Sequence, residues 1–270
     1  MNNGCETVNE NILKIENLSI SFGGLRAVDN LSFEIKNQEI FGLIGPNGAG
    51  KTTVFNCITQ FYRPDTGSVI FRTNQDELID LVGLPVHKII NLGLARTFQN
   101  VELIKELTVL DNLLVGAHIL FKSGFVSHAF KTPKARREEK ELIEKAEEIL
   151  KFLDLYEIKD YRVGGLSYGM LKKIELGRVL MSNPKLIILD EPAAGLNDSE
   201  TDQLAKTIHL IREKYNCSIL LVEHDMRLVM GICDRICAIS FGKKLAIGTP
   251  KEIQSNKAVQ EAYLGKEDDE

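Results

Sequence analysis

Residues 45 to 53 read Gly-Pro-Asn-Gly-Ala-Gly-Lys-Thr-Thr, a spacing of glycines, one lysine and a hydroxyl that is suited to holding phosphates. The glycines let the backbone approach a ligand more closely than a Cβ would permit. Successive backbone N–H groups can then form an anion nest at a helix start, with Lys51 reaching the β- and γ-phosphates and Thr52 ligating Mg²⁺. A glycine-rich turn without a ligand is the alternative. The full motif between a strand and a helix favours a nucleoside triphosphate site.

Two further groups of polar residues directly follow apolar stretches. Asp190 and Glu191 come after Leu186 to Leu189, and His224 comes soon after Ser218 to Val222. Ligands collect at the carboxyl ends of parallel strands, so Asp190 can hold Mg²⁺, directly or through water, and Glu191 can polarise the attacking water. Paired carboxylates can also cap a helix, and a histidine after a strand is often structural. A phosphate-binding loop in the same chain favours a γ-phosphate contact for His224.

The segment Leu-Ser-Tyr-Gly-Met at residues 166 to 170 predicts a second helix start able to accept an anion. Ser167 is a good N-cap residue, and Gly169 permits close backbone approach. The chain has only one lysine-bearing phosphate loop. We therefore expect a composite site, in which this segment completes the nucleotide site of another chain in a dimer or pseudo-dimer.

Composition indicates a globular protein of ordinary polarity. The chain has 270 residues, of which 26% are charged and 44% hydrophobic. Its net charge of −5 argues weakly against a general nucleic-acid binder, which usually carries a basic face. The cysteines form no metal-binding pattern and are expected to be free thiols, mostly buried, in a reducing compartment: Cys5, Cys57, Cys217, Cys233 and Cys237. No signal peptide and no run of 18 apolar residues is seen. We therefore expect a cytosolic chain whose membrane association goes through a partner.

The elements that must position these residues alternate between apolar strands and helices. Ile12 to Ser21 and Leu31 to Lys36 show the alternation of antiparallel strands, separated by a glycine-containing turn, and Phe41 to Ile44 is a buried strand before the phosphate loop. The sequence predicts an α/β protein with a mainly parallel core sheet and an antiparallel β layer. Further strands are expected at residues 68–72, 186–189 and 218–222 and as a hairpin at 236–247; helices are expected at 84–93, 107–120, 138–155, 170–181, 201–214, 226–233 and 251–264.

The predicted organisation is a single ATP-binding domain with a helical insertion. We divide it into an ATP-binding core with the antiparallel layer (11–98), a helical subdomain (99–170), the rest of the core (171–250), and a C-terminal helix with an acidic tail (251–270). Residues 122–137 are expected to be loop-like and basic. The amphipathic helix at 138–155 carries its apolar residues on one face.

Taken together, these motifs resemble those of the ATP-binding subunits of ABC transporters, over nearly the whole chain. GPNGAGKTT is similar to the Walker A motif, LIILDEP to Walker B, RTFQN to the Q-loop, LSYGM to the signature and LLVEHDM to the switch segment. The stretches ARTFQNV, DEPAAGLN and EHDMRLVMGICDRI resemble the LivG-type subunits of branched-chain amino acid importers. So do the ending AYLG and the long gap between Gln99 and Ser167.

The resemblance implies a role for each matching residue. Phosphates and adenosine would be held by Phe22, Gly45, Asn47, Gly48, Ala49, Gly50, Lys51, Thr52 and Thr53, with Mg²⁺ near Thr52, Gln99 and Asp190. Phe22 would stack on adenine, Glu191 would be the general base or water orienter, and His224 would contact the γ-phosphate. Ser167 and Gly169 would serve the partner's ATP. Tyr168, Met170 and Asn197 depart from the residues that many members carry.

The resemblance also implies partners and a location. The chain would form a homo- or heterodimer of ATPase subunits on two membrane permeases at the cytoplasmic face of the inner or plasma membrane, fed indirectly by an extracytoplasmic solute-binding protein. Urea or amide import and lipopolysaccharide export are alternatives within the family. A soluble ABC ATPase of DNA repair or translation would usually carry coiled-coil arms or two ATPase domains, whereas this chain has one phosphate loop and no heptad run. A non-enzymatic regulatory module would need a degraded site, and none is seen.

Overall fold

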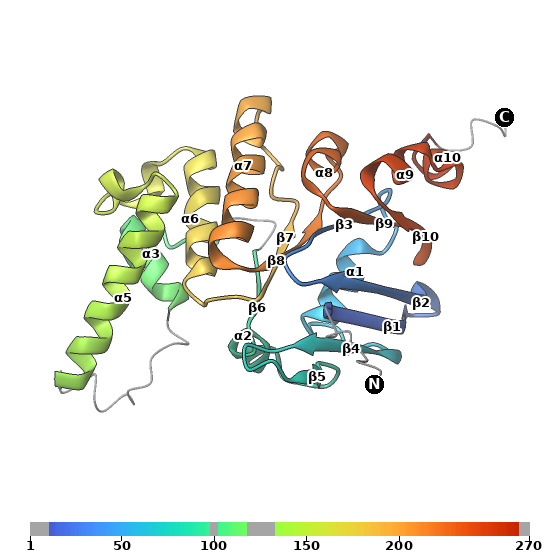
Figure 1. The fold of residues 1–270 in the computed structure, drawn as a ribbon, viewed down its shortest axis with the longest axis horizontal. Coiled ribbons are helices and arrows are strands. Elements are labelled where there is room, and N and C mark those ends of the chain that lie inside the picture. The colour runs from blue at the N-terminus through green and yellow to red at the C-terminus, as the bar shows by residue number, and fades with distance from the viewer. Residues whose placement is uncertain (1–10, 98–101, 118–132, 265–270) are drawn as a thin grey trace, which may run out of the picture.

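The computed structural model describes residues 11–97, 102–117 and 133–264, and its core is a six-stranded, mostly parallel sheet (Figure 1). Its strand order is β10 (Lys243–Gly248), β9 (Arg235–Ser240), β3 (Ile40–Ile44), β8 (Ser218–Val222), β7 (Leu186–Asp190) and β6 (Leu94–Arg96). Only the β9–β10 pair is antiparallel. The predicted α/β class with a mainly parallel core sheet is confirmed.

The predicted antiparallel layer is a separate four-stranded sheet. Its order is β2 (Leu25–Lys36), β1 (Asn11–Phe22), β4 (Thr66–Arg72) and β5 (Leu78–Asp80). The turn predicted across residues 22–30 is wrong in length, because β1 and β2 continue until only Gly23 and Gly24 separate them. Both glycines have positive φ, at 52° and 88°, and two such residues close a tight hairpin without splaying the strands.

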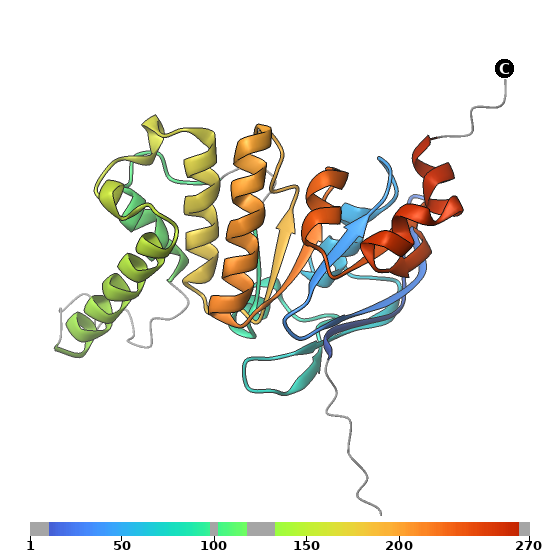
Figure 2. The ribbon, with the colours of Figure 1, turned by 45° about the horizontal axis from the view of Figure 1, so that its top comes forward.

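Burial explains why the central strands are mostly apolar. Every residue of β3, β7 and β8 is buried. Successive side chains point to opposite faces of the sheet, so Ile40 packs into one hydrophobic cluster with the large helices and Phe41 packs into another with α1 and the four-stranded sheet. Figure 2 shows α6, α7 and α8 side by side, away from the four-stranded sheet.

Helices lie between the strands along the chain and after the last of them. They are α1 (Lys51–Ile58), α2 (Val86–Asn91), α3 (Val109–Gly116), α5 (Pro133–Phe152), α6 (Tyr168–Leu180), α7 (Asp198–Tyr215), α8 (Met226–Ile232), α9 (Pro250–Ser255) and α10 (Lys257–Leu264). Helices α3 and α5 pack with α6 at one end of the molecule (Figure 1). Within the described ranges, no helix is long and apolar enough to cross a membrane.

Two helix predictions need correction. Residues 133–137, expected to be loop-like, already belong to α5, and the rest of that predicted loop, 122–132, lies outside the described residues. The single helix predicted at 251–264 is two helices, because Asn256 adopts an extended conformation (φ −77°, ψ 116°). Its side-chain oxygen accepts a hydrogen bond from the Val259 N–H (3.2 Å), so Asn256 ends one helix and caps the next.

Candidate functional site

A cleft of about 530 Å³ lies at the carboxyl end of β3, at the predicted phosphate loop. Residues 47–53 form its floor, and Glu191 lines it from the end of β7. Gly48 and Gly50 have φ values of +78° and +102°, which L side chains rarely adopt. A Cβ at residue 50 would also lie 2.7 Å from the Ala27 carbonyl oxygen. The loop therefore needs glycine at these positions, as its sequence predicts.

The start of α1 can accept an anion. Its N-cap residue is Gly50, which has no side chain to accept hydrogen bonds from the first backbone N–H groups of the helix. These N–H groups are therefore available to a bound anion. Thr52 and Thr53 follow in the first turn and line the cleft. This geometry suits the phosphates of a nucleotide, with a threonine hydroxyl available beside them.

Lys51 lies in the cleft wall and is largely buried. Its Nζ donates hydrogen bonds to the carbonyl oxygens of Gly45 (2.6 Å) and Pro46 (3.2 Å). Burial lowers the pKa of Lys51, and the nearby negative charges of Glu191 and Asp190 oppose that change. The lysine is thus held against the phosphate loop, with acidic groups close by.

Asp190 is the last residue of β7 and is 7% exposed. Its pKa is raised to about 6, chiefly by burial and then by the neighbouring charge of Glu191, while Arg96 acts in the opposite direction. The Asp190 N–H donates to Thr97 Oγ1 at 3.4 Å. A buried carboxyl at a strand end is a suitable oxygen ligand for a hard cation such as Mg²⁺.

Glu191 and His224 meet above the neighbouring strand ends. His224 Nδ1 lies 3.7 Å from Glu191 Oε1, and its side chain is 58% exposed. Glu191 has an αL backbone (φ 46°), and its N–H donates to the Val222 carbonyl at 2.8 Å. Because β3, β8 and β7 are adjacent and parallel, their ends bring Lys51, Asp190, Glu191 and His224 to one edge.

No group of three or more His, Cys, Asp or Glu side chains among the described residues forms a complete metal site. Mg²⁺ usually keeps several waters and takes one or two carboxylates together with substrate phosphates. Thr52 and Asp190 fit such a role. The predicted third member, Gln99, lies outside the described residues, so its role stays a prediction.

The predicted adenine-stacking residue, Phe22, does not line the cleft. Its ring packs edge-on against Tyr62, with centroids 5.2 Å apart. Two large, exposed apolar side chains line the cleft, Leu25 (72% exposed) and Phe241 (88% exposed). Sequence reasoning missed both, because each belongs to a hairpin and nothing in the local pattern distinguishes it from an ordinary turn residue.

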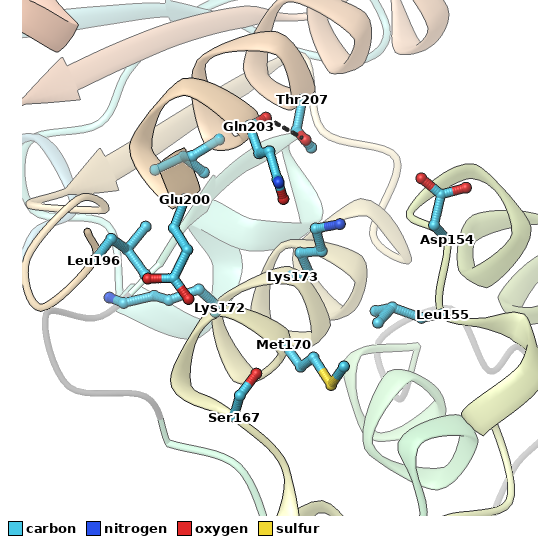
Figure 3. A pocket seen from close by; sticks show the side chains of 12 residues that line it. Asp154, Leu155, Ser167, Met170, Lys172, Lys173, Leu196, Glu200, Gln203 and Thr207 are labelled. Atoms are coloured by element: carbon cyan, nitrogen blue, oxygen red, sulfur yellow. Dashed lines mark hydrogen bonds between the residues drawn. The ribbon is translucent and has the colours of Figure 1, made fainter. Parts of the chain in front are cut away.

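Ser167 and Gly169 line a separate cavity of about 210 Å³ between α6 and α7, shown in Figure 3. Ser167 is the N-cap of α6, as predicted, but its side chain makes no capping hydrogen bond. A Cβ at Gly169 would lie 3.0 Å from Glu200 Oε1, so the close approach there involves α7. Neither residue lines the nucleotide cleft. Their service to a nucleotide would therefore require a second chain.

Glu223 is a further site residue that sequence reasoning missed. Its side chain is fully buried beside His224, and its Oε2 lies 3.7 Å from His224 Nδ1. A glutamate between an apolar strand and a histidine carries no local sign that it will be buried. The apolar residues before it were the only available signal.

Comparisons with known proteins show which family of proteins this chain resembles. The family model described as "ABC transporter" matches residues 28–194, and the model described as "Branched-chain amino acid ATP-binding cassette transporter" matches residues 243–269. The high-affinity branched-chain amino acid transport ATP-binding proteins LivG of Salmonella typhimurium and BraF of Pseudomonas aeruginosa are each 46% identical over 254 residues. Those alignments cover 94% of this chain and 98% of each relative.

Solved structures show the same likeness. A crystal structure of the ADP conformation of an ATP-binding cassette of an ABC transporter superposes with a TM-score of 0.81 at 34% identity. It covers 95% of this chain and 99% of that chain. A nucleotide-free ATP-binding cassette from an ABC transporter gives 0.80 at 33% identity, covering 95% and 100%.

Proposed function

The chain belongs to the ABC transporter family of ATP-binding proteins, and from this we propose that it hydrolyses ATP to power the import of branched-chain amino acids through membrane permeases. The observation that carries the proposal is the cleft, where the phosphate loop faces Glu191, while Asp190 and His224 lie beside Glu191 at the ends of adjacent parallel strands. The names of the LivG and BraF relatives and the C-terminal family match support the choice of solute.

In the proposed mechanism, the backbone of residues 47–53 and Lys51 hold the phosphates. Glu191 takes the proton of the attacking water or orients it, and His224 contacts the γ-phosphate from the β8 end. Asp190, Thr52 and Gln99 would hold Mg²⁺, which when bound neutralises charge on the β- and γ-phosphates. The 3.7 Å separation of His224 Nδ1 and Glu191 Oε1 supports the proposal that both side chains act on one phosphate group.

We further propose that the chain works as a dimer. Ser167 and Gly169 would complete the partner's nucleotide site, since they lie outside this chain's own cleft. The helical segment 99–170 would dock a permease at the cytoplasmic face of the membrane, and a solute-binding protein would act through that permease. Its described helices α3 and α5 pack together at one end of the molecule, which supports a separate docking role for this segment.

The test is solute-stimulated ATPase activity in lipid vesicles. The chain would be assembled with its permeases and binding protein, and leucine, isoleucine, valine and urea would be added separately. We expect stimulation by the branched-chain amino acids and its loss in Glu191→Gln. Stimulation by urea alone would assign a different solute, and activity indifferent to all four would refute the proposed transport reaction.

A further inference from the structure

The carboxylate of Glu223 joins two loops that are far apart in sequence. Its Oε1 accepts a hydrogen bond from the Ala193 N–H (2.8 Å), in the loop after β7. Its Oε2 accepts two more, from the N–H groups of His224 (2.9 Å) and Asp225 (3.1 Å), after β8. A fully buried carboxylate is costly unless hydrogen-bonded, and these three donors satisfy it.

Both joined loops carry proposed catalytic side chains. Glu191 lies two residues before Ala193, and His224 follows Glu223 directly. His224 Nδ1 is 3.7 Å from both Glu191 Oε1 and Glu223 Oε2. The Glu191 N–H also donates to the Val222 carbonyl (2.8 Å), so the backbone between Glu191 and His224 is held by this bond and, beyond it, by the one buried side chain of Glu223.

The loop after β7 continues from this link toward the start of α6. A Cβ at Gly195 would lie 3.1 Å from the Tyr168 ring, so the two residues are in close contact. Leu196 lines the cavity of Figure 3 together with Ser167 and Met170. A displacement of Ala193 would thus be felt at Glu191 on one side and at the α6 turn on the other.

We propose that Glu223 is a positioning residue for ATP hydrolysis, whose carboxylate fixes the loop of Glu191 to the loop of His224 so that both side chains face the γ-phosphate. The inference rests on the proposed function. It depends on an acceptor at both oxygens: in Glu223→Gln one oxygen becomes an NH₂ group, which cannot accept a backbone N–H. The amide would keep the volume of the side chain and break the link on one side.

The first experiment compares Glu223→Gln with the unaltered chain and with Glu39→Gln. Glu39 is also a buried carboxylate that accepts a backbone hydrogen bond, from Lys36, but it precedes β3 at the opposite end of the sheet. We expect Glu223→Gln to lower kcat by about 10- to 100-fold through misplacement, with the KM for ATP little changed. Glu39→Gln should keep the wild-type kcat, although its melting temperature falls.

The wild-type chain and the Glu223→Gln variant distinguish failure of the proposed ATPase function from failure of the positioning role of Glu223. A wild-type chain without ATPase activity would refute the proposed function itself. An active wild-type chain with the same kcat in Glu223→Gln would refute only the positioning role. On a His224→Ala background, Glu223→Gln should cost clearly less than it does alone, since Glu223 acts in part through His224. Full additivity would indicate a purely structural role.

If Glu223→Gln fails to fold, two further measurements still test the positioning role of Glu223. Glu223→Asp keeps the charge but is one methylene shorter and cannot span both loops, so a folded Glu223→Asp with wild-type kcat would overturn the proposal. Amide hydrogen exchange in the unaltered chain needs no variant. The amides of Ala193, His224 and Asp225 should be protected, and exchange at the rate of open loops would contradict the link.

Discussion

Replacing Asp190 by asparagine should stabilise the nucleotide-free protein while removing its activity. The pKa of this carboxyl is raised from its ordinary 3.8 to about 6, so the folded chain binds the proton more tightly than the unfolded chain. Ionised Asp190 therefore destabilises the fold. By linkage, stability falls as pH rises through this window and then levels off above pH 6.

The expected magnitude follows from that shift. A pKa raised from 3.8 to about 6 corresponds to about 3 kcal/mol of unfolding free energy at pH 7.5 and about 1.5 kcal/mol at pH 5. Asp190→Asn removes this cost, less any penalty for an unsatisfied amide, which does not depend on pH. The difference in unfolding free energy between Asp190→Asn and the wild type should therefore fall by about 1.5 kcal/mol when the pH is lowered from 7.5 to 5.

The assay is urea unfolding of both proteins at the two pH values, without nucleotide or Mg²⁺. The chain has no tryptophan, so far-ultraviolet circular dichroism is the suitable signal. Asp76→Asn is the matched control, because Lys185 lowers the pKa of Asp76 and its charge stays constant between pH 5 and 7.5. An Asp190→Asn difference independent of pH, or one that grows at pH 5, would refute the reasoning.

Three further predictions concern single groups. Glu191→Gln should still bind ATP but hydrolyse it ~10²–10⁴-fold more slowly, measured by equilibrium binding and phosphate release; an unchanged rate would exclude it as the base. Phe241→Ala should weaken nucleotide binding more than Phe22→Ala, because Phe241 lines the cleft; the reverse order in a fluorescent-nucleotide titration would favour the role that the resemblance implies for Phe22. At pH 8, iodoacetamide should leave four thiols unmodified in the native chain and modify them in urea, since burial raises the pKa of each: Cys57, Cys217, Cys233 and Cys237. Labelling of these thiols in the native chain would contradict their burial.

Sequence reasoning was most accurate where chemistry is local. The phosphate loop requires glycines at 48 and 50 because their backbone angles exclude other residues, and a motif can show this directly. Errors occurred where local patterns are compatible with two outcomes. The pattern of residues 251–264 predicts one helix through Asn256, yet the Asn256 side chain forms a cap that divides it into two. The division of the chain at residues 99 and 170 and the role of Gln99 stay predictions.

By itself, the sequence determined the fold class, the phosphate loop and the strand ends that carry Asp190, Glu191 and His224, because short-range patterns specify strands, helices and glycine-dependent turns. Only the tertiary structure decided which side chains meet. Glu223 accepts a hydrogen bond from an amide 30 positions away, and Phe241 reaches the cleft through a hairpin that packs on the phosphate loop. Such contacts depend on strand order and register, which bring distant segments together and which no local pattern records.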